Sequence, residues 1–351
     1  MSLTKLDIDR FITTLRTKSK EYNSINNVQL ASMLEETISN IKEVSFFWAT
    51  ICSDNKGTTK TPAEGEEWLG GPFASVLATQ YYINSLTNDD DLIEKKYNSE
   101  ENSYKVFPNN FTERITFPFI DAKVIFNKSM SFDDINKYRG FSKRYDIDPS
   151  ITLVLGAGNF SSIPYLDVLY HLITRKSVIL LKLNPVNEYL KPVFEKVFQN
   201  FIERGYIIVT TGNIDESKYM ATHPGINHIH LTGSDKTYED IVYGRELTGN
   251  ERSIKTVPKV NSKPITSELG NVTPIIIHPG KWSTSDIKYQ ARKIVTGKLN
   301  NNGFNCIAAQ VVVLPDGCCL LYTSPSPRDQ RGSGLAAGGW KKKGGGGGGG
   351  G

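Results

Sequence analysis

The stretch ITLVLGAGN, residues 151–159, decides the fold: a short apolar run ends in a glycine turn. The same alternation recurs downstream, with apolar runs at 178–183, 206–209 and 229–231 and helical segments at 163–174, 187–204 and 235–243. Short β-rich runs that alternate with helices are typical of a parallel sheet with right-handed crossovers. The pattern predicts an α/β fold with a parallel-sheet domain over residues 150–263. Ligand sites in such sheets lie at the carboxyl ends of the strands, where the glycine turns fall in this chain.

The region before this sheet, residues 1–149, has a different pattern. Apolar residues recur at helical spacing over 8–15 and 30–51, so we expect a helical N-terminal region. Residues 53–67 are polar and predict a loop, and Gly70-Gly71-Pro72 predicts a turn into a further helix. The acidic, Asn-rich segment 88–110 predicts a surface insertion.

The last part of the sequence looks foreign to the rest. From residue 319 it reads CLLYTSPSPRD, and it ends in three lysines and eight glycines, as a translated sequencing adapter followed by homopolymer reads would. We expect residues 318–351 to be a non-native, disordered tail, because such a composition buries too little apolar surface to offset its ordering entropy. Residues 264–317 would then be only the first part of a second, incomplete α/β catalytic domain. On this interpretation the chain as given is truncated and inactive.

Charge and cysteine content limit the class of protein. The tail holds five basic residues and one acidic residue, which accounts for the whole formal net charge of +4. The rest of the chain is therefore neutral overall and gives no indication of a nucleic-acid partner. Of the four cysteines, Cys318 and Cys319 belong to the tail, and the remaining Cys52 and Cys306 are too few for a disulfide framework. Neither a secretory signal nor a segment of transmembrane length is present. We expect a cytoplasmic protein without a membrane span.

The segment from Glu268 to Cys306 carries groups suited to acyl chemistry. It begins ELGNVTP at residue 268 and ends NNGFNC at residue 306. A thiol attacks a carbonyl, a carboxylate handles protons, and glycine lets backbone amides approach the reacting oxygen. The apolar flanks of Glu268 predict a desolvated carboxylate, which suits a general base. Taken alone, a glutamate such as Glu268 is about as often an ordinary surface residue as a catalytic base, and a cysteine such as Cys306 is more often a buried, inert thiol than a nucleophile.

The two motifs, in this order, resemble the aldehyde dehydrogenase superfamily. Its sites carry Glu-Leu-Gly-Gly, with a proline four positions past the first glycine, followed by Asn-x-Gly-Gln-x-Cys. Asn271 and Phe304 depart from this pattern. The resemblance implies that Cys306 is the nucleophile, that Glu268 activates water, and that Asn159, in an Asn-Phe pair after the first strand, holds the carbonyl oxygen.

The resemblance also assigns residues to a cofactor, NAD or NADP. Lys182 and Asn184 lie where the family contacts the adenosine ribose, and Gly233 and Ser234 lie where it contacts the pyrophosphate. Without the resemblance, the usual interpretation of Lys182 is a solvated residue at a strand end, and that of Ser234 is a helix N-cap. Pro185 stands where NAD-preferring members carry a carboxylate, so both dinucleotides stay open.

Two other motifs give weaker signals. Gly156-x-Gly158 follows a strand, but Ser161 leaves the six-residue dinucleotide fingerprint incomplete, so an ordinary strand-to-helix turn is the better interpretation. Three histidines fall on a turn and on alternate strand positions, without a cysteine or carboxylate at ligand spacing. We therefore expect no metal site at His223, His228 and His230.

The function implied by the resemblance is NAD(P)-dependent oxidation of an aldehyde to a carboxylic acid. It proceeds through a thiohemiacetal and then a thioester on Cys306, and hydride passes to the nicotinamide. The nearest alternative runs backward, as an acyl-CoA or fatty-acyl reductase that produces an aldehyde. A second alternative is a nucleotide-binding relative without catalysis. The partner is a small aldehyde or acyl substrate, and the full-length protein is expected to be a homo-oligomer.

Overall fold

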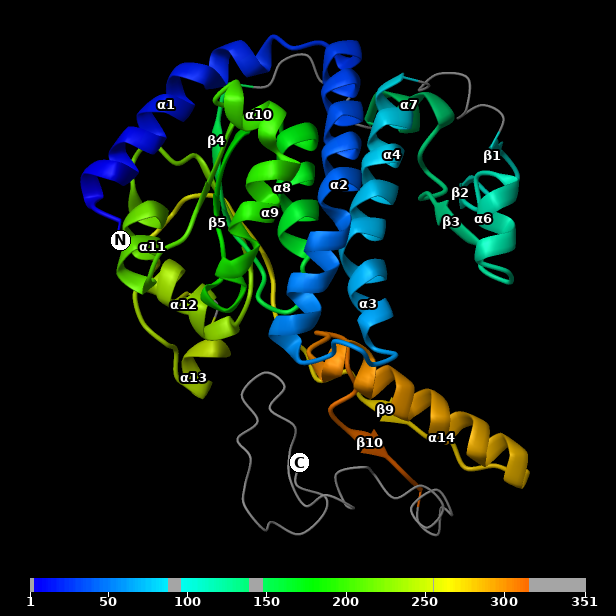
Figure 1. Cartoon of the computed structure of the whole chain (residues 1–351). Coiled ribbons are helices and arrows are strands. Elements are labelled where there is room, and N and C mark those ends of the chain that lie inside the picture. The colour runs from blue at the N-terminus through cyan, green and yellow to red at the C-terminus, as the bar shows by residue number, and fades with distance from the viewer. Residues whose placement is uncertain (1–2, 88–95, 139–147, 255, 316–351) are drawn as a thin grey trace.

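The computed structural model describes residues 3–87, 96–138, 148–254 and 256–315. At its centre lies a five-stranded sheet in the order β6-β5-β4-β7-β8, and all neighbouring strands pair in parallel (Figure 1). The predicted α/β fold is therefore confirmed. The strands are β4 (Ile151–Leu155), β5 (Val178–Lys182), β6 (Ile207–Thr210), β7 (His228–Thr232) and β8 (Ile265–Glu268).

Strands β4 and β5 are buried along their whole length, which explains their continuous apolar runs. Leu155 lies opposite Lys182 and Leu231, and Thr232 lies opposite Glu268. The carboxyl ends of four strands therefore meet at one edge of the sheet. Strand β8 is mostly exposed and largely polar, and the apolar pattern did not predict it.

Helices cover both faces of the sheet. Figure 1 shows α1 (Lys5–Asn23) on one side and α8 (Ile163–Thr174), α9 (Lys191–Val197) and α10 (Gln199–Glu203) on the other. The remaining helices of this unit are α11 (Ile214–Thr222), α12 (Asp235–Tyr243) and α13 (Gly249–Arg252). The single helix predicted over 187–204 is wrong, since the segment forms a 3-10 turn, η3 (Pro185–Leu190), followed by α9 and α10. Pro192 in the first turn of α9 cannot donate the hydrogen bond that a continuous helix requires.

The predicted N-terminal helices are present and share their core with the sheet. Helix α2 (Asn27–Lys56) places Trp48 against Phe194 of α9, with ring centroids 5.7 Å apart. One cluster of buried apolar residues runs from Ile8 to Ile241. The N-terminal helices and the sheet therefore enclose one hydrophobic core.

The end of this helical region differs from the prediction. The segment expected as a loop and turn contains α3 (Glu64–Trp68) and a π-helical turn, η1 (Leu69–Phe73), which runs into α4 (Ala74–Thr87). Gly57 ends α2 in the left-handed conformation. Glycine at position 70 is required for packing, because a β-carbon there would collide with the Phe160 ring. The residues predicted to form a turn therefore make a close contact with another segment of the chain.

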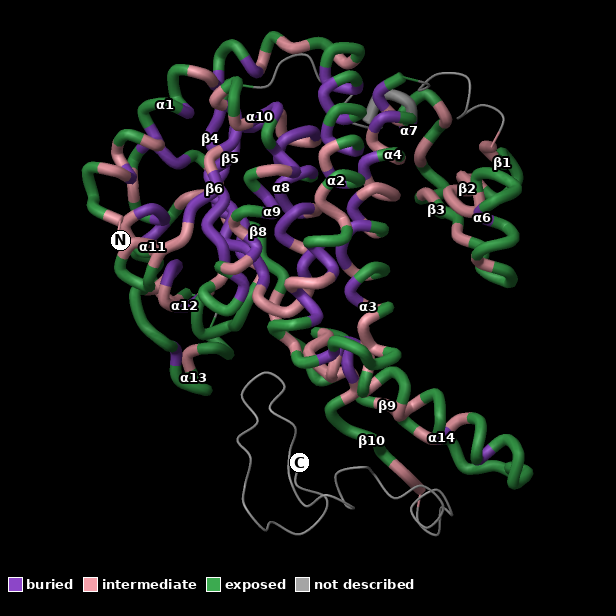
Figure 2. Tube along the Cα trace, in the orientation of Figure 1, coloured by how far each residue is buried: buried purple, intermediate pink, exposed green. Residues whose placement is uncertain are grey.

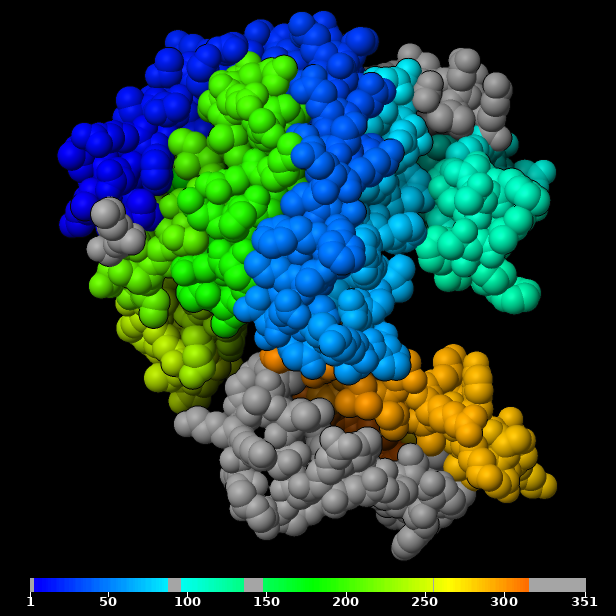
Figure 3. All heavy atoms as spheres, in the orientation of Figure 1, coloured from blue at the N-terminus to red at the C-terminus, as the bar shows by residue number. Residues whose placement is uncertain are grey.

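The insertion predicted over 88–110 forms part of a small lobe. Strands β1 (Tyr97–Asn98), β2 (Ser103–Phe107) and β3 (Ala122–Ile125) make an antiparallel sheet, accompanied by α6 (Phe111–Thr116) and α7 (Phe132–Tyr138). Residues 88–95 lie outside the described part of the chain. Figure 3 shows the lobe projecting beside α4, with a hollow between it and α14.

The last described segment extends away from the main body. It consists of β9 (Ile275–Ile276), α14 (Thr284–Leu299), the 3-10 turn η4 (Asn300–Gly303) and β10 (Val312–Val313), and β10 pairs in parallel with β9. Within α14, Ile287 and Ala291 are buried but Leu299 is 37% exposed, and Figure 2 shows most of the helix as exposed. The tail expected over 318–351 lies outside the described residues. Within the described ranges, no helix has the length and apolarity needed to cross a membrane.

Candidate active site

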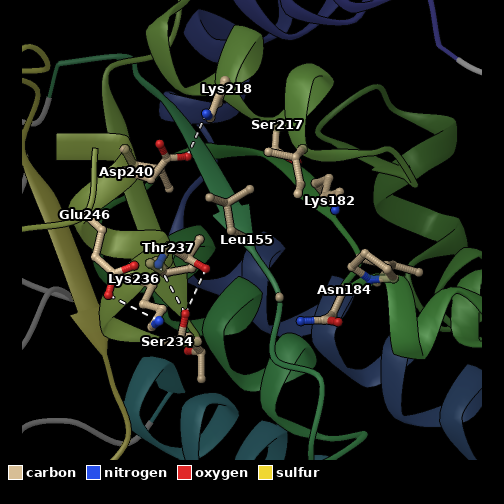
Figure 4. A pocket seen from close by; sticks show the side chains of 18 residues that line it. Leu155, Lys182, Asn184, Ser217, Lys218, Ser234, Lys236, Thr237, Asp240 and Glu246 are labelled. Atoms are coloured by element: carbon tan, nitrogen blue, oxygen red, sulfur yellow. Dashed lines mark hydrogen bonds and ion pairs between the residues drawn. The ribbon is translucent and has the colours of Figure 1, made fainter. Parts of the chain in front are cut away.

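A cavity of about 560 Å³ opens at the carboxyl edge of the sheet. Figure 4 shows Lys182 and Asn184 on one side of Leu155, and Ser234, Lys236 and Glu246 on the other. All four residues predicted to contact a cofactor line this cavity: Lys182, Asn184, Gly233 and Ser234. They come from the ends of two strands and from the turns that follow them. The structure therefore brings the predicted cofactor set together.

Lys182 is more buried than a strand-end lysine usually is. Its relative exposure is only 6%, so the interpretation as a solvated strand end is wrong. Burial lowers the pKa of its ammonium, an effect that the carboxylates of Glu188 and Glu216 partly offset. Among the described residues, none forms a hydrogen bond or an ion pair with this ammonium. The cavity thus contains a buried cation that lacks a partner within the described structure.

The start of α12 forms the opposite wall of the cavity. Ser234 Oγ accepts a hydrogen bond from Thr237 N at 3.1 Å, which is N-cap geometry. Gly233 N donates to the Glu268 carbonyl oxygen at 3.0 Å and so ties this turn to β8. The N-cap interpretation of Ser234 is therefore confirmed, and the helix presents its positive end to the cavity.

The loop before the cysteine docks on the turn after β4. Asn159 Nδ2 donates to the Phe304 carbonyl oxygen at 3.1 Å, and Asn301 Nδ2 donates to the Asn159 carbonyl oxygen at 3.0 Å. Asn301, Asn302 and Gly303 all have positive φ, a conformation that asparagine and glycine tolerate best. This Asn-Asn-Gly run is what lets the loop turn back onto Asn159.

Cys306 and Glu268 are both exposed. The prediction that apolar flanks desolvate Glu268 is wrong, because β8 is an edge strand and no described segment covers its last side chain. Glu268 lies beside Gly233, whereas the Cys306 loop lies against Asn159. No hydrogen bond between described residues joins Glu268 to Cys306. The structure therefore brings Asn159 to the thiol loop but does not bring Glu268 into contact with it.

Sequence reasoning missed a group of residues next to this loop. Lys56 Nζ, at the end of α2, donates to Asn301 Oδ1 at 2.7 Å and to both carboxylate oxygens of Glu67 at 2.8 and 2.9 Å. Glu66 accepts a hydrogen bond from Asn301 N. The acidic run at the start of α3 was the only local signal, and nothing in it indicated a partner far along the chain.

The weaker motifs have structural explanations. A β-carbon on Gly158 would lie 2.8 Å from Val186 and 2.9 Å from the Asn184 side chain, so this glycine permits close packing of two turns. His230 contacts Thr266 at 2.8 Å and Asp167 at 3.2 Å within the protein. In the part of the chain that the structure describes, no three His, Cys, Asp or Glu side chains are placed to hold a metal.

A sequence model of the aldehyde dehydrogenase family matches residues 172–319, which include β5, the cavity turns and the thiol loop. Over these residues the chain is similar to the aldehyde dehydrogenase family. Among curated relatives, 4,4'-diaponeurosporen-aldehyde dehydrogenase of Staphylococcus aureus is 25% identical over 122 residues. That match covers 35% of this chain and 23% of the relative.

Solved structures of aldehyde dehydrogenases share the fold. Betaine aldehyde dehydrogenase of Staphylococcus aureus, in complex with NAD+, superposes with a TM-score of 0.57 at 15% identity and covers 90% of this chain and 52% of its own. NADP-dependent glyceraldehyde-3-phosphate dehydrogenase of Bacillus halodurans, complexed with NADP, superposes with a TM-score of 0.56 at 16% identity, and the match covers 90% of this chain and 54% of its own. The chain therefore spans about half the length of these structures.

Proposed function

We propose that the protein catalyses NAD(P)-dependent oxidation of an aldehyde to a carboxylic acid, with Cys306 as the nucleophile. The observation that carries this proposal is the docking of the Cys306 loop on Asn159, at 3.1 Å between Asn159 Nδ2 and the Phe304 carbonyl oxygen. The two segments are separated by 145 positions in the chain. This contact supports the proposal because carbonyl attack requires a thiol and a carboxamide donor, and the two segments that meet here carry one of them each.

The cavity at the carboxyl edge of the sheet suits a dinucleotide. It offers the buried ammonium of Lys182 and the N-terminus of α12, both of which attract the oxygens of a ribose or a pyrophosphate. When bound, such a cofactor supplies the two-electron acceptor that aldehyde oxidation needs. Lys182 and Asn184 would hold its ribose end, and Gly233 and Ser234 its phosphates.

Charges around the cavity bear on the choice between NAD and NADP. Its two carboxylates are each paired, Asp240 with Lys218 at 2.9 Å and Glu246 with Lys236 at 3.2 Å. Pro185 supplies no charge at the position next to Asn184. An added 2′-phosphate therefore meets no unpaired carboxylate among the lining residues, and we propose that the site accepts both dinucleotides.

The reacting groups divide the work as follows. The Cys306 thiolate adds to the carbonyl carbon, while the Asn159 carboxamide and the Cys306 backbone N–H donate to the oxygen as it gains negative charge. After oxidation the acyl group remains on sulfur as a thioester. Glu268 accepts a proton from water, which attacks the thioester and releases the carboxylic acid and the free thiol. The exposed carboxylate of Glu268 is accessible to that water.

A reductase that takes its acyl group from a thioester donor is the second candidate. The absence of a hydrogen bond between Glu268 and Cys306 among the described residues favours it, because acyl loading from a thioester needs no water-activating base. The acyl group would pass to Cys306 as the donor thiol leaves, and a reduced dinucleotide would supply the hydride that releases it as an aldehyde. Incubation of the chain with an acyl-CoA would place a stable acyl adduct on Cys306, which intact-mass measurement detects.

Peptide-resolved alkylation tests the proposed function without requiring turnover. The chain is treated with iodoacetamide at pH 7, with and without a millimolar aliphatic aldehyde. We expect the aldehyde to protect Cys306 by reversible addition and an Asn159→Ala variant to need at least about tenfold more aldehyde, the loss of one charge-stabilising donor. Cys306 labelling that is insensitive to the aldehyde in both proteins would refute the assignment of the nucleophile.

A further inference from the structure

We infer that Lys56, held in place by Glu67, is a positioning residue for the thiol site: it fixes Asn301 and, through Asn301, both Asn159 and the loop that carries Cys306. This inference rests on the proposed function, since it assigns a role in that site to the corner between α2 and α3. Figure 3 shows this corner resting on the segment that begins at η4.

Lys56 and Glu67 form a largely buried ion pair. Their side chains are 12% and 4% exposed, and Lys56 Nζ lies 2.8 and 2.9 Å from the two carboxylate oxygens. Burial of two charges is costly unless further hydrogen bonds satisfy them. The third hydrogen bond of the ammonium goes to Asn301 Oδ1 at 2.7 Å, so the ion pair completes its hydrogen bonding only when the thiol loop is docked.

Asn301 is the residue of the Cys306 loop that forms hydrogen bonds with the corner between α2 and α3. It is 3% exposed, with Oδ1 on Lys56, Nδ2 on the Asn159 carbonyl oxygen at 3.0 Å, and its backbone N–H on Glu66. Its φ of 52° is in the left-handed region, which asparagine adopts only at some cost. Three anchors on one strained residue determine where the following residues lie.

The anchored position is transmitted to both sides of the site. Phe304 N donates to the Asn301 carbonyl oxygen at 2.9 Å, and the Phe304 carbonyl oxygen accepts from Asn159 Nδ2. Lys56 also lies over the Phe160 ring, 5.6 Å from its centroid. The same ammonium thus contacts the turn that carries the carboxamide donor and the loop that carries the thiol.

The experiment separates positioning from simple stabilisation. Lys56→Met removes the donor but leaves Glu67 buried and unpaired, which threatens folding. The double variant Lys56→Met/Glu67→Gln removes both charges and leaves no unpaired buried ion. Lys42→Met is the matched control, since Lys42 is an exposed residue of the same helix without an ion pair among the described residues. Lys56→Arg retains the charge and the donors.

Two measurements on the full chain are compared with its thermal melt. We expect the double variant to melt near the temperature of the parent. Its backbone amides at 301–304 should exchange hydrogen at least tenfold faster. Half-protection of Cys306 against iodoacetamide should need at least tenfold more aldehyde than in the parent. Lys56→Arg should stay within threefold of the parent in both. Exchange and protection that remain within twofold of the Lys42→Met control, or exchange that rises equally in β4 and β5, would overturn the inference.

Failure of the proposed function gives a different pattern. If Cys306 is not the nucleophile, aldehyde fails to protect it in the parent as well as in the variants. Hydrogen exchange at 301–304 still reports whether Lys56 holds the loop, because that measurement needs no substrate. Faster local exchange without any aldehyde protection in the parent would therefore refute the catalytic assignment and, with it, the catalytic role inferred for Lys56.

Discussion

Substitution of Lys182 by methionine should weaken dinucleotide binding and stabilise the empty protein at the same time. The ammonium is 6% exposed, has no hydrogen-bond partner among the described residues, and lines the cavity. Burial without a partner disfavours its charged form, as the lowered pKa indicates. A ligand oxygen would supply the missing partner, so the same group that weakens the empty site strengthens the occupied one.

The expected size follows from the chemistry of that contact. A hydrogen bond to a charged group contributes about 1.5–3 kcal/mol, which corresponds to about 10- to 150-fold in Kd. Because the ammonium is buried, the ratio of the two Kd values should change little between low and moderate salt, unlike the effect of a surface lysine. Methionine keeps most of the aliphatic volume, so the cavity should retain its shape.

Fluorescence titration of the dinucleotide into the parent, Lys182→Met and Lys191→Met measures this directly. Lys191 is a half-buried lysine of α9 that pairs with Glu195 and does not line the cavity, so its loss should leave Kd unchanged. Thermal melts of the empty proteins test the second half, with Lys182→Met expected to melt at the same or a higher temperature. Equal affinity of Lys182→Met and the parent would refute the placement of the cofactor on this lysine.

Other predictions concern reactivity, stability and cofactor choice. Burial raises the pKa of Cys52 to about 11 from 9.0, which lowers its thiolate fraction about 100-fold, so iodoacetamide at pH 7 should label exposed Cys306 at least that much faster, by peptide mass spectrometry. Burial, followed by the neighbouring His230, lowers the pKa of His171 from 6.5 to about 3; the unfolded state then binds more protons between those pH values, and stability should fall as pH drops from 6.5 toward 3. Urea unfolding between pH 7 and 5 measures how the free energy of unfolding changes with pH. In a His171→Phe variant this change should be smaller than in the parent by up to about 1.4 kcal/mol per pH unit. Phe194→Ala, which empties a fully buried site beside Trp48, should cost about 3–5 kcal/mol in the same assay. Kd values for NAD and NADP should agree within about tenfold, and a preference for NAD of several hundredfold would show that an acidic group takes the ribose.

The central sheet could be predicted from the sequence because its strands are buried on both faces. The bounds predicted for β4, α8 and α12 agree with the structure, since each is a short apolar or amphipathic segment between clear turn signals. The residues predicted to bind a cofactor line one cavity for a related reason, because the residues that follow parallel strands meet at one edge of the sheet. Strand β8 was missed because it is a mostly exposed, polar edge strand and lacks the apolar run that marks the others.

The surroundings of the thiol site could not be predicted in the same way. The contact between Lys56 and Asn301 spans 245 positions, and an ion pair at that separation leaves no periodicity in either local sequence. The exposure of Glu268 depends on what covers an edge strand, which flanking apolar residues do not determine. Local chemistry predicted which groups would react, whereas long-range packing decides which of them meet.

The long separation between Asn159 and its partners also sets an order of events as the chain folds. Strands β4 and β5 are joined by one short crossover, with Ser150 and Ser177 only 27 positions apart, whereas Asn159 meets Phe304 across 145. Contacts between distant segments form late because a larger loop must close first. The sheet edge that forms the cavity is therefore complete before the cysteine loop arrives. During that interval the loop that carries Cys306 lacks its contact with the Asn159 carboxamide, and the proposed nucleophile is the last part of the site to acquire its surroundings.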